Sequence, residues 1–311
     1  MSDAVVVNWN EAGKVLSLEQ KQFYDINGYL LIRSCVAKSE IDRFHRRFQE
    51  ICQGVNVSPE MTVAIDPLAV RNGQLKGESV VSKLRDTTHD PILFEYCKYP
   101  AIVDVVSDLI AKPNDCVMAM HGMLINKPPD IDNHSYHPIH QDLVYFNFRP
   151  ADLICAAWTA MERVTRANGC LCVVPGSHKW KSEVLDHGYP KWDKGVNPAY
   201  YGIKEFDPNT AELVHVEMEA GDTLFFHPLL LHGSGANRTN GFRKAISCHY
   251  ANGDRCRYVS VTGTNQEEIE KMTVETMQKR LKKLGRGNEI ATFADYFRRQ
   301  AKPVGNRRAN L

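Results

Sequence analysis

The chain has 311 residues, of which 43% are hydrophobic and 24% are charged, and its formal net charge is +1. This length allows one large domain with a sizeable core, and the near-neutral charge argues against nucleic acid or an anionic membrane as the main partner. The longest apolar runs, such as Pro228–Leu231, are far below the roughly 18 residues that a membrane-spanning helix needs. The N-terminal residues lack the basic and apolar regions of a secretory signal, so we expect a soluble intracellular protein.

The first hundred residues are predicted to be mainly helical. Residues 17–20, Ser-Leu-Glu-Gln, match a capping box and predict a helix that ends near Asn27–Gly28. Tyr29–Ile32 is a short predicted strand. Ser39 is the predicted N-cap of a second helix, which ends near Gln53–Gly54 and whose apolar residues recur at spacings of three and four: Ile41, Phe44, Phe48 and Ile51.

From about residue 115 the apolar pattern becomes strand-like. Short apolar runs bounded by Gly, Pro, Asn or Asp follow one another: residues 117–127, 153–162, 169–174, 214–218, 223–226 and 244–251. This pattern is typical of an antiparallel sandwich or barrel. Segment 176–210, rich in Lys, Trp, Tyr and Pro, interrupts it and is predicted to be a long loop, either a lid or a plain surface excursion. A final helix is predicted from Gln266 to about Leu284.

We therefore predict a single domain, residues 1–311, that is mainly β with flanking helices. Residues 115–262 would form a double-stranded β-helix, or jelly roll, into which the 176–210 loop is inserted. Residues 1–114 would form a mainly helical N-terminal layer, and residues 263–311 a C-terminal helix and tail.

The nine cysteines are scattered through apolar segments, and none forms a C-x-x-C pair. The closest two, Cys170 and Cys172, lie in a strand-like run in which both side chains would point to one face. An odd number in such surroundings is typical of reduced core thiols and not of a disulfide framework.

The motif His140-Gln141-Asp142 carries the predicted chemistry. In an extended segment, residues i and i+2 project to the same side, so an imidazole and a carboxylate can hold one ion together. Two histidines and one carboxylate leave coordination positions open, which suits Fe(II) that binds a chelating co-substrate and dioxygen. The His-x-Asp triplet alone is a weak signal in a chain with 12 histidines, so a third ligand from a distant strand is needed.

The segment from Phe225 to Gly235 offers two candidates for that third ligand, His227 and His232. His232 is favoured because Ser234 follows it, where a hydroxyl can donate to a carboxylate of a bound ligand. Eleven residues after His232 comes Arg243. Arginine suits a dicarboxylate because its planar guanidinium donates two parallel hydrogen bonds.

Two other histidines are interpreted as structural. His227 is taken as a polar residue near a strand end. His215 and Glu217 also have i,i+2 spacing, but no histidine and arginine follow them in the same arrangement, so they are interpreted as an outward-facing strand pair.

Several longer stretches give a more specific signal than the triplet. They are residues 137–143 (HPIHQDL), 146–150 (FNFRP), 157–162 (AWTAME), 168–171 (NGCL), 174–179 (VPGSHK) and the run from Phe225 to His249. Together they resemble the phytanoyl-CoA dioxygenase family of Fe(II)- and 2-oxoglutarate-dependent oxygenases, from about Phe23 to the last helix. The loop from Asp130 to Tyr136 departs from the family sequence, which bears on substrate preference and not on metal binding.

The resemblance implies a jelly-roll oxygenase whose iron ligands are His140, Asp142 and His232. It implies contacts to 2-oxoglutarate at six positions: Lys83, Met123, Gln141, Trp158, Ser234 and Arg243. Lys83 and Met123 rest on the resemblance alone, since the sequence pattern by itself indicates a solvated charge and a core residue. Trp158 could equally be a core aromatic residue. The implied cofactors are Fe(II), 2-oxoglutarate as co-substrate and O2, with ascorbate as a supporting reductant.

The reaction that the resemblance implies is hydroxylation at C2 of a fatty acyl-CoA, such as the 3-methyl-branched phytanoyl-CoA, with release of succinate and CO2. Four basic residues are candidates for contacts to CoA phosphates or, alternatively, belong to a solvated charged face: Lys127, Arg149, Lys179 and Lys181. The alternatives are the same iron chemistry on another small molecule and a non-catalytic ligand-binding jelly roll. A halogenase would lack the carboxylate ligand, so Asp142 argues against one.

The last residues, Arg307 to Leu311, resemble a variant of the C-terminal Ser-Lys-Leu address that the peroxisomal import receptor reads. Three residues can match such a signal by chance. Together with the family resemblance they predict a peroxisomal protein, with the cytoplasm as the alternative.

Overall fold

The computed structural model describes residues 11–73, 77–130, 135–181, 183–188, 201–204, 206–207, 211–289 and 291–304. The tail from Arg307 to Leu311, part of the predicted 176–210 loop and part of the loop from Asp130 to Tyr136 lie outside the described residues. Among the described helices, none combines the length and the apolar composition that crossing a membrane requires.

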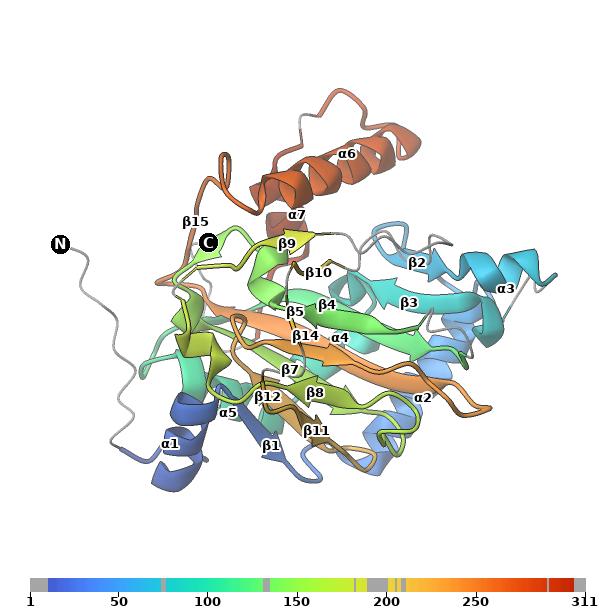
Figure 1. Cartoon of the computed structure of the whole chain (residues 1–311). Coiled ribbons are helices and arrows are strands. Elements are labelled where there is room, and N and C mark those ends of the chain that lie inside the picture. The colour runs from blue at the N-terminus through green and yellow to red at the C-terminus, as the bar shows by residue number, and fades with distance from the viewer. Residues whose placement is uncertain are drawn as a thin grey trace.

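Two antiparallel β-sheets pack face to face, as the predicted jelly roll requires (Figure 1). The major sheet has eight strands, in the order β1 (Tyr29–Ile32), β12 (Thr223–Phe226), β7 (Ile154–Ala160), β14 (Arg243–Asn252), β4 (Val117–Lys127), β3 (Val81–Arg85) and β2 (Thr62–Ile65), with β16 (Lys302–Pro303) paired to β4. The minor sheet has four strands, in the order β11 (Val214–Val216), β8 (Leu171–Val173), β13 (His232–Ser234) and β5 (His137–His140). One apolar cluster joins Trp158 and Leu224 of the major sheet to Leu171 and Val173 of the minor sheet, and this interior holds the candidate site.

Helices cover the other side of the major sheet. Phe44 of α2 and Tyr96 of α4 belong to one buried cluster with Leu84 and Tyr250 of the sheet, and each such side chain contributes roughly 1.5–3 kcal/mol of burial free energy.

The α-helices are α1 (Leu18–Asn27), α2 (Lys38–Cys52), α3 (Pro67–Arg71), α4 (Leu93–Cys97), α5 (Pro100–Ile110), α6 (Glu267–Lys283) and α7 (Phe293–Gln300). Short 3-10 turns are η1 (Glu78–Val80), η2 (Thr87–His89), η3 (Asp142–Tyr145), η4 (Ala151–Leu153) and η5 (Ser177–Lys179). Two short pairs complete the strands, β9 (His187–Gly188) with β10 (Gly202–Ile203), and β6 (Phe148–Arg149) with β15 (Arg257–Tyr258).

The predicted start of the first helix is confirmed and that of the second is wrong. Ser17 and Gln20 form the capping box of α1, and Gly28 ends the helix with a φ of 78°. The N-cap of α2 is Ala37, so Ser39 lies inside the first turn. Tertiary contacts set this start, because the Val36 N–H donates to Gly221 O at 3.0 Å just before the helix begins.

The N-terminal layer is less helical than predicted, because β2 and β3 extend the major sheet. β3 was missed because Lys83 and Arg85 occupy its interior face, which hides the alternation of apolar and polar residues typical of a half-buried strand. The helix α7 was also missed, although Thr292 and Asp295 form a capping box that could have indicated it. All nine cysteines are thiols outside any disulfide, as predicted.

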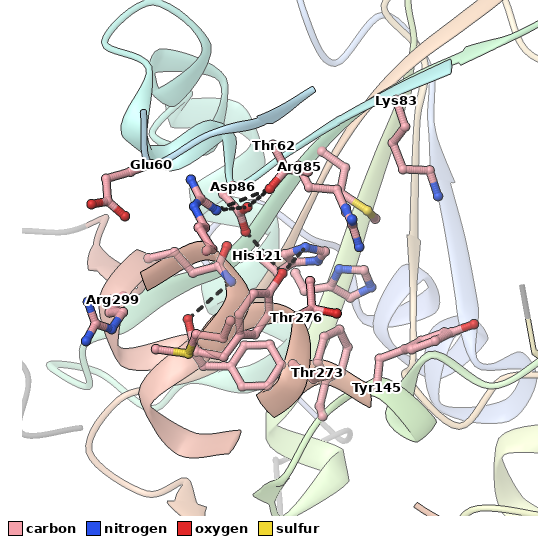
Figure 2. A pocket seen from close by; sticks show the side chains of 18 of the residues that line it. Glu60, Thr62, Lys83, Arg85, Asp86, His121, Tyr145, Thr273, Thr276 and Arg299 are labelled. Atoms are coloured by element: carbon pink, nitrogen blue, oxygen red, sulfur yellow. Dashed lines mark hydrogen bonds and ion pairs between the residues drawn. The ribbon is translucent and has the colours of Figure 1, made fainter. Parts of the chain in front are cut away.

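The two C-terminal helices are attached to the major sheet through one carboxylate. Asp86 follows β3 with a φ of 62°, and its buried side chain accepts a hydrogen bond from Thr62 Oγ1 at 2.8 Å. It also accepts from Arg280 Nη1 of α6 and from the Tyr296 hydroxyl of α7, both at 3.1 Å (Figure 2). Asp86 therefore joins α6 and α7 to the sheet.

We predict that Asp86→Asn lowers the free energy of unfolding by about 2 kcal/mol, because it removes the charge that strengthens the hydrogen bonds from Arg280 and Tyr296. Asparagine tolerates the left-handed backbone, so the change isolates the charge. Urea denaturation measures the effect, and Tyr296→Phe, which removes one neutral donor, should cost only about 1 kcal/mol. Equal losses for the two variants would show that the carboxylate charge contributes nothing.

Candidate active site

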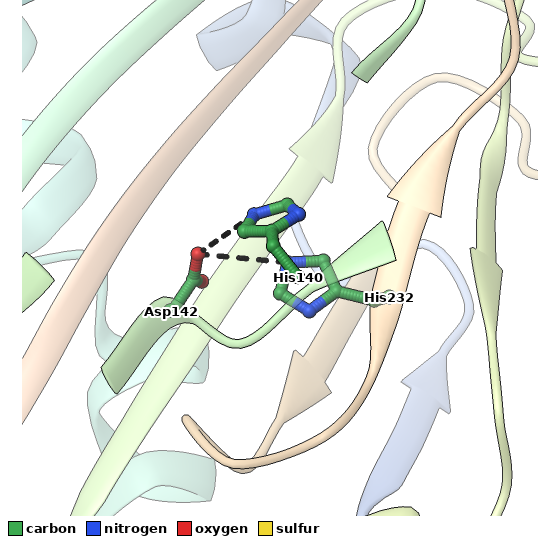
Figure 3. Close-up of side chains that lie close together, drawn as sticks. All are labelled: His140, Asp142 and His232. Atoms are coloured by element: carbon green, nitrogen blue, oxygen red, sulfur yellow. Dashed lines mark ion pairs between the residues drawn. The ribbon is translucent and has the colours of Figure 1, made fainter. Parts of the chain in front are cut away.

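The structure brings His140, Asp142 and His232 together inside the jelly roll (Figure 3). His140 ends β5 and His232 begins β13, and the two residues are direct partners across these antiparallel strands. Asp142 begins η3, and its Oδ1 lies 3.2 Å from His140 Nε2 and 3.6 Å from His232 Nε2. All three side chains are buried, and one ligand atom from each lies within 4.8 Å of the others.

Hydrogen bonds fix the orientation of each of these side chains. His140 Nδ1 lies 2.9 Å from Pro138 O, and His232 Nδ1 lies 2.9 Å from Leu230 O. Because a carbonyl oxygen only accepts, each Nδ1 carries the proton, and each Nε2 faces the centre of the triad with its lone pair. Asp142 Oδ2 accepts from His249 Nε2 at 2.7 Å, which leaves Oδ1 directed at the two histidines.

The electrostatics of the triad keep its carboxylate ionised. Burial alone would raise the pKa of Asp142, but when the neighbouring rings are protonated the charges of His232 and His249 and the hydrogen bonds from His140 and His232 hold it well below its usual range. Burial lowers the pKa of His140, and His232 lowers it further. For His232 the attraction of Asp142 outweighs burial and raises the pKa. Two imidazole nitrogens and one carboxylate oxygen are a donor set that fits Fe(II), and each of the three side chains is held by a hydrogen bond at its other polar atom.

His227, the other candidate for the third ligand, lies outside the triad of His140, Asp142 and His232. Its Nε2 is 3.0 Å from Asp152 Oδ1, and its Nδ1 accepts from the Leu229 N–H at 3.1 Å. The pair His215 and Glu217 is exposed at the minor sheet, as the sequence predicted.

The residues predicted to contact 2-oxoglutarate share the interior, with one exception. Met123 and Trp158 flank Ser247 in adjacent strands, so their side chains point to the same face of the major sheet. The Arg243 guanidinium lies 5.2 Å from the Trp158 ring centroid, and its Nη2 donates to Gly169 O at 3.1 Å. Ser234 follows His232 by two residues in β13 and therefore projects to the same side. Trp158 is buried in the apolar cluster as well, so it has the core packing that was its alternative.

Gln141 is the exception, because its side-chain amide is engaged in holding two loops. Its Nε2 donates to Leu229 O at 2.9 Å, and its Oε1 accepts from the Leu185 N–H at 2.8 Å. A contact from Gln141 to a co-substrate stays a prediction.

A cavity of about 200 Å³ opens from the triad toward the C-terminal helices (Figure 2). His140, Asp142, Lys83 and Met123 line one part of it. Its other walls come from β2 and β3, from α6 and from α7. They include apolar side chains of the helices, Met272, Met277, Leu281 and Phe297, and of Leu284, the C-cap of α6. This wall could not be predicted, since the apolar pattern of a helix indicates which face is buried but not what that face borders.

The four basic residues considered for CoA phosphates lie elsewhere. Lys127 is buried inside the jelly roll, where it donates to Ser234 Oγ. The predictions that it contacts a CoA phosphate or lies on a solvated charged face are therefore both wrong. Arg149 binds Gln266 and Glu183, Lys179 binds Asp25, and Lys181 is exposed. The cationic residues that line the cavity are Lys83, Arg85, Arg280 and Arg299.

The comparison with known sequences decides the family. A profile of the phytanoyl-CoA dioxygenase (PhyH) family matches residues 24–245. The chain belongs to the phytanoyl-CoA dioxygenase family. It is 56% identical to a probable phytanoyl-CoA dioxygenase of Caenorhabditis elegans over 98% of both chains. It is 48% identical to the peroxisomal phytanoyl-CoA dioxygenase of Rattus norvegicus, covering 96% of this chain and 85% of the relative.

A solved structure of low sequence identity shows the same fold. The epimerase SnoN in complex with Fe3+, alpha ketoglutarate and nogalamycin RO is 18% identical, with a TM-score of 0.57, and the match covers 78% of this chain and 86% of the other. The two proteins thus share one fold.

We predict that His249→Leu lowers the Fe(II) affinity by about tenfold, because Asp142 loses the hydrogen bond that aims its Oδ1 at the triad. His249→Gln keeps an N–H donor and should fall between this variant and the wild type. Anaerobic metal titration measures the affinity. The matched control is His227→Ala, which removes another buried imidazole that does not touch the triad. A loss of affinity in His227→Ala as large as that in His249→Leu would contradict the assignment.

Proposed function

We propose that the protein is an Fe(II)- and 2-oxoglutarate-dependent dioxygenase that hydroxylates C2 of a fatty acyl-CoA of the phytanoyl-CoA type, with release of succinate and CO2. The observation that carries the proposal is the buried face formed by His140, Asp142 and His232, which borders the cavity. The substrate class is taken from the relatives, which are named phytanoyl-CoA dioxygenases.

Separate groups of residues would bind the iron and the co-substrate. His140, Asp142 and His232 would hold the iron through Nε2, Oδ1 and Nε2. Arg243 and Ser234 would bind the distal carboxylate of 2-oxoglutarate, since a guanidinium and a hydroxyl are both donors. When bound, Fe(II) and 2-oxoglutarate supply, with O2, the power to oxidise an unactivated C–H bond. The buried surroundings of the triad exclude water from it.

The cavity supports an acyl-CoA as the substrate. The methionine and leucine side chains of α6 offer an apolar surface for the acyl chain, and methionine adapts to irregular shapes such as a methyl branch. Arg85 also lines the cavity and is half-buried, and its side chain makes no hydrogen bond or ion pair within the described part of the chain. Arg85 is the cross-strand partner of Met123, and both line the cavity, where the guanidinium would meet the polar head of the substrate (Figure 2).

The activity is tested by measuring succinate formation from 2-oxoglutarate with a panel of straight and 3-methyl-branched acyl-CoAs and the matching free acids. We expect 3-methyl-branched acyl-CoAs to stimulate turnover most and to give the 2-hydroxy product. Succinate formation that no acyl-CoA stimulates would point to another small molecule. Iron-loaded protein that forms no succinate under any condition would contradict the enzyme itself.

For Arg243→Gln we predict that the 2-oxoglutarate concentration needed for half-maximal turnover rises at least about tenfold, which corresponds to about 1.4 kcal/mol. The reason is the loss of charge-assisted hydrogen bonds worth roughly 1.5–3 kcal/mol each. The measurement is 2-oxoglutarate saturation, with Fe(II) affinity and thermal stability expected to change little.

A second series separates this role from a structural one. Oxo acids without a distal carboxylate cannot use the guanidinium, so Arg243→Gln should cost them much less activity. Equal losses for both kinds of oxo acid, or a loss of stability with co-substrate affinity preserved, would show that Arg243 does not hold that carboxylate.

A peroxisomal location is proposed because the rat and human relatives are named peroxisomal. We predict that a fluorescent protein ending in Arg307–Leu311 enters peroxisomes through the import receptor. Imaging beside a fusion ending in Ser-Lys-Leu checks this. A fusion that stays in the cytoplasm while the Ser-Lys-Leu control is imported would refute the role of the tail.

A further inference from the structure

A buried lysine lies beside the arginine proposed to bind the co-substrate. Lys127 ends β4 and is the direct cross-strand partner of Arg243 in β14, so both side chains leave the sheet on its interior face. Its ammonium group donates to Ser135 O at 2.7 Å, to Ser234 Oγ at 2.8 Å and to Gly235 O at 2.6 Å. No local sequence pattern indicates this burial.

The direction of these hydrogen bonds determines what Ser234 can do. In its charged form Lys127 has three hydrogens and no acceptor, so two of the hydrogens go to the carbonyl oxygens and the third goes to Ser234 Oγ, which is then the acceptor. Among the described residues this is the only hydrogen bond of Ser234 Oγ. The hydrogen of the Ser234 hydroxyl is therefore available for another acceptor, on the face of β13 that also carries His232.

The lysine and the arginine converge on one glycine. Arg243 Nη2 donates to Gly169 O at 3.1 Å, while the stem of Lys127 lies against the position that a Cβ of the same residue would occupy. A Cβ at Gly169 would lie 3.0 Å from Lys127 Cδ and 2.5 Å from Gly235 O, and its φ of +82° also favours glycine. The absence of a side chain at Gly169 thus allows Lys127 and Arg243 to lie beside the same residue.

Two neighbouring cations in a buried region favour the binding of an anion. Burial and the charge of Arg243 both lower the pKa of Lys127, an effect that Asp130 partly opposes. A dicarboxylate bound beside the pair would supply negative charge and an acceptor for the Ser234 hydrogen together.

We propose that Lys127 is a positioning residue for 2-oxoglutarate: it fixes Ser234 Oγ as an acceptor, which turns the hydroxyl hydrogen toward the distal carboxylate. The inference rests on the proposed function, because it needs 2-oxoglutarate to bind beside Ser234 and Arg243. It adds to the predicted contacts a residue that touches the co-substrate only through Ser234.

The test is equilibrium binding, which needs no turnover. Protein loaded with redox-inactive Mn(II) is titrated by calorimetry with 2-oxoglutarate and with 2-oxopentanoate, which has the same chain length but no distal carboxylate. Lys127→Met should weaken 2-oxoglutarate binding about tenfold and change 2-oxopentanoate binding little. In a Ser234→Ala background the same change should have almost no further effect, because the hydroxyl that Lys127 orients is gone.

Two further variants make the result specific. Lys244→Met removes another buried lysine, whose ammonium pairs with Glu78 at 3.3 Å, and should leave 2-oxoglutarate binding unchanged. If Lys127→Met does not fold, Lys127→Gln, which keeps N–H donors for the two carbonyl groups, replaces it under the same criteria.

The outcomes separate this inference from the proposed function. Wild-type protein that does not bind 2-oxoglutarate, or Arg243→Gln that binds it normally, would contradict the proposed co-substrate site. With those two results as expected, the positioning role is overturned by unchanged binding in Lys127→Met. It is also overturned by equal losses for both oxo acids, or by an undiminished loss in the Ser234→Ala background.

Discussion

The pairing of β13 with β5 places His232 directly opposite His140, and the candidate site depends on this register. A slip of one residue would turn every side chain of the strand to the other face and separate the two imidazoles. Gly233 allows the close approach, because a Cβ there would lie 2.9 Å from His137 O. The same strand presents Ser234 to the interior, so the proposed metal ligand and the proposed co-substrate contact are set by one backbone pairing.

The triad is also connected to the far side of the cavity. Asp142 Oδ2 accepts from His249 of the major sheet, and the His249 ring stacks on His121 at a centroid distance of 6.1 Å. His121 Nε2 lies 3.5 Å from the Tyr296 hydroxyl, which donates to Asp86 at 3.1 Å. Burial lowers the pKa of His121 to about 3, so this ring is neutral and the contacts along the row do not depend on its charge. The orientation of a candidate metal ligand and the attachment of α7 therefore share one row of side chains.

The strands of the jelly roll and the three proposed iron ligands could be predicted, because their signals lie in short stretches of the sequence. The strands Val117–Lys127 and Thr223–Phe226 follow from apolar runs between turn residues, and His140, Asp142 and His232 follow from strand geometry and the family resemblance. The burial of Lys127 could not be predicted, because two of the three oxygens that hold its ammonium group come from Ser234 and Gly235, which are distant in sequence. His249 was missed because nothing in its apolar strand distinguishes it from a core residue. Arg85 was missed for the opposite reason, since a charged residue in a short strand normally indicates solvent.

The attachment of α6 and α7 through Asp86 has an evolutionary consequence. The residues proposed for iron and 2-oxoglutarate come from the sheets and the segments that join them, whereas much of the cavity wall comes from a helical pair near the end of the chain. Substitutions on that pair can alter the shape of the cavity without touching the triad. Substrate range and oxidative chemistry can thus diverge at separate rates, and a chimaera that exchanges residues 267–300 with a relative is a direct route to altered specificity.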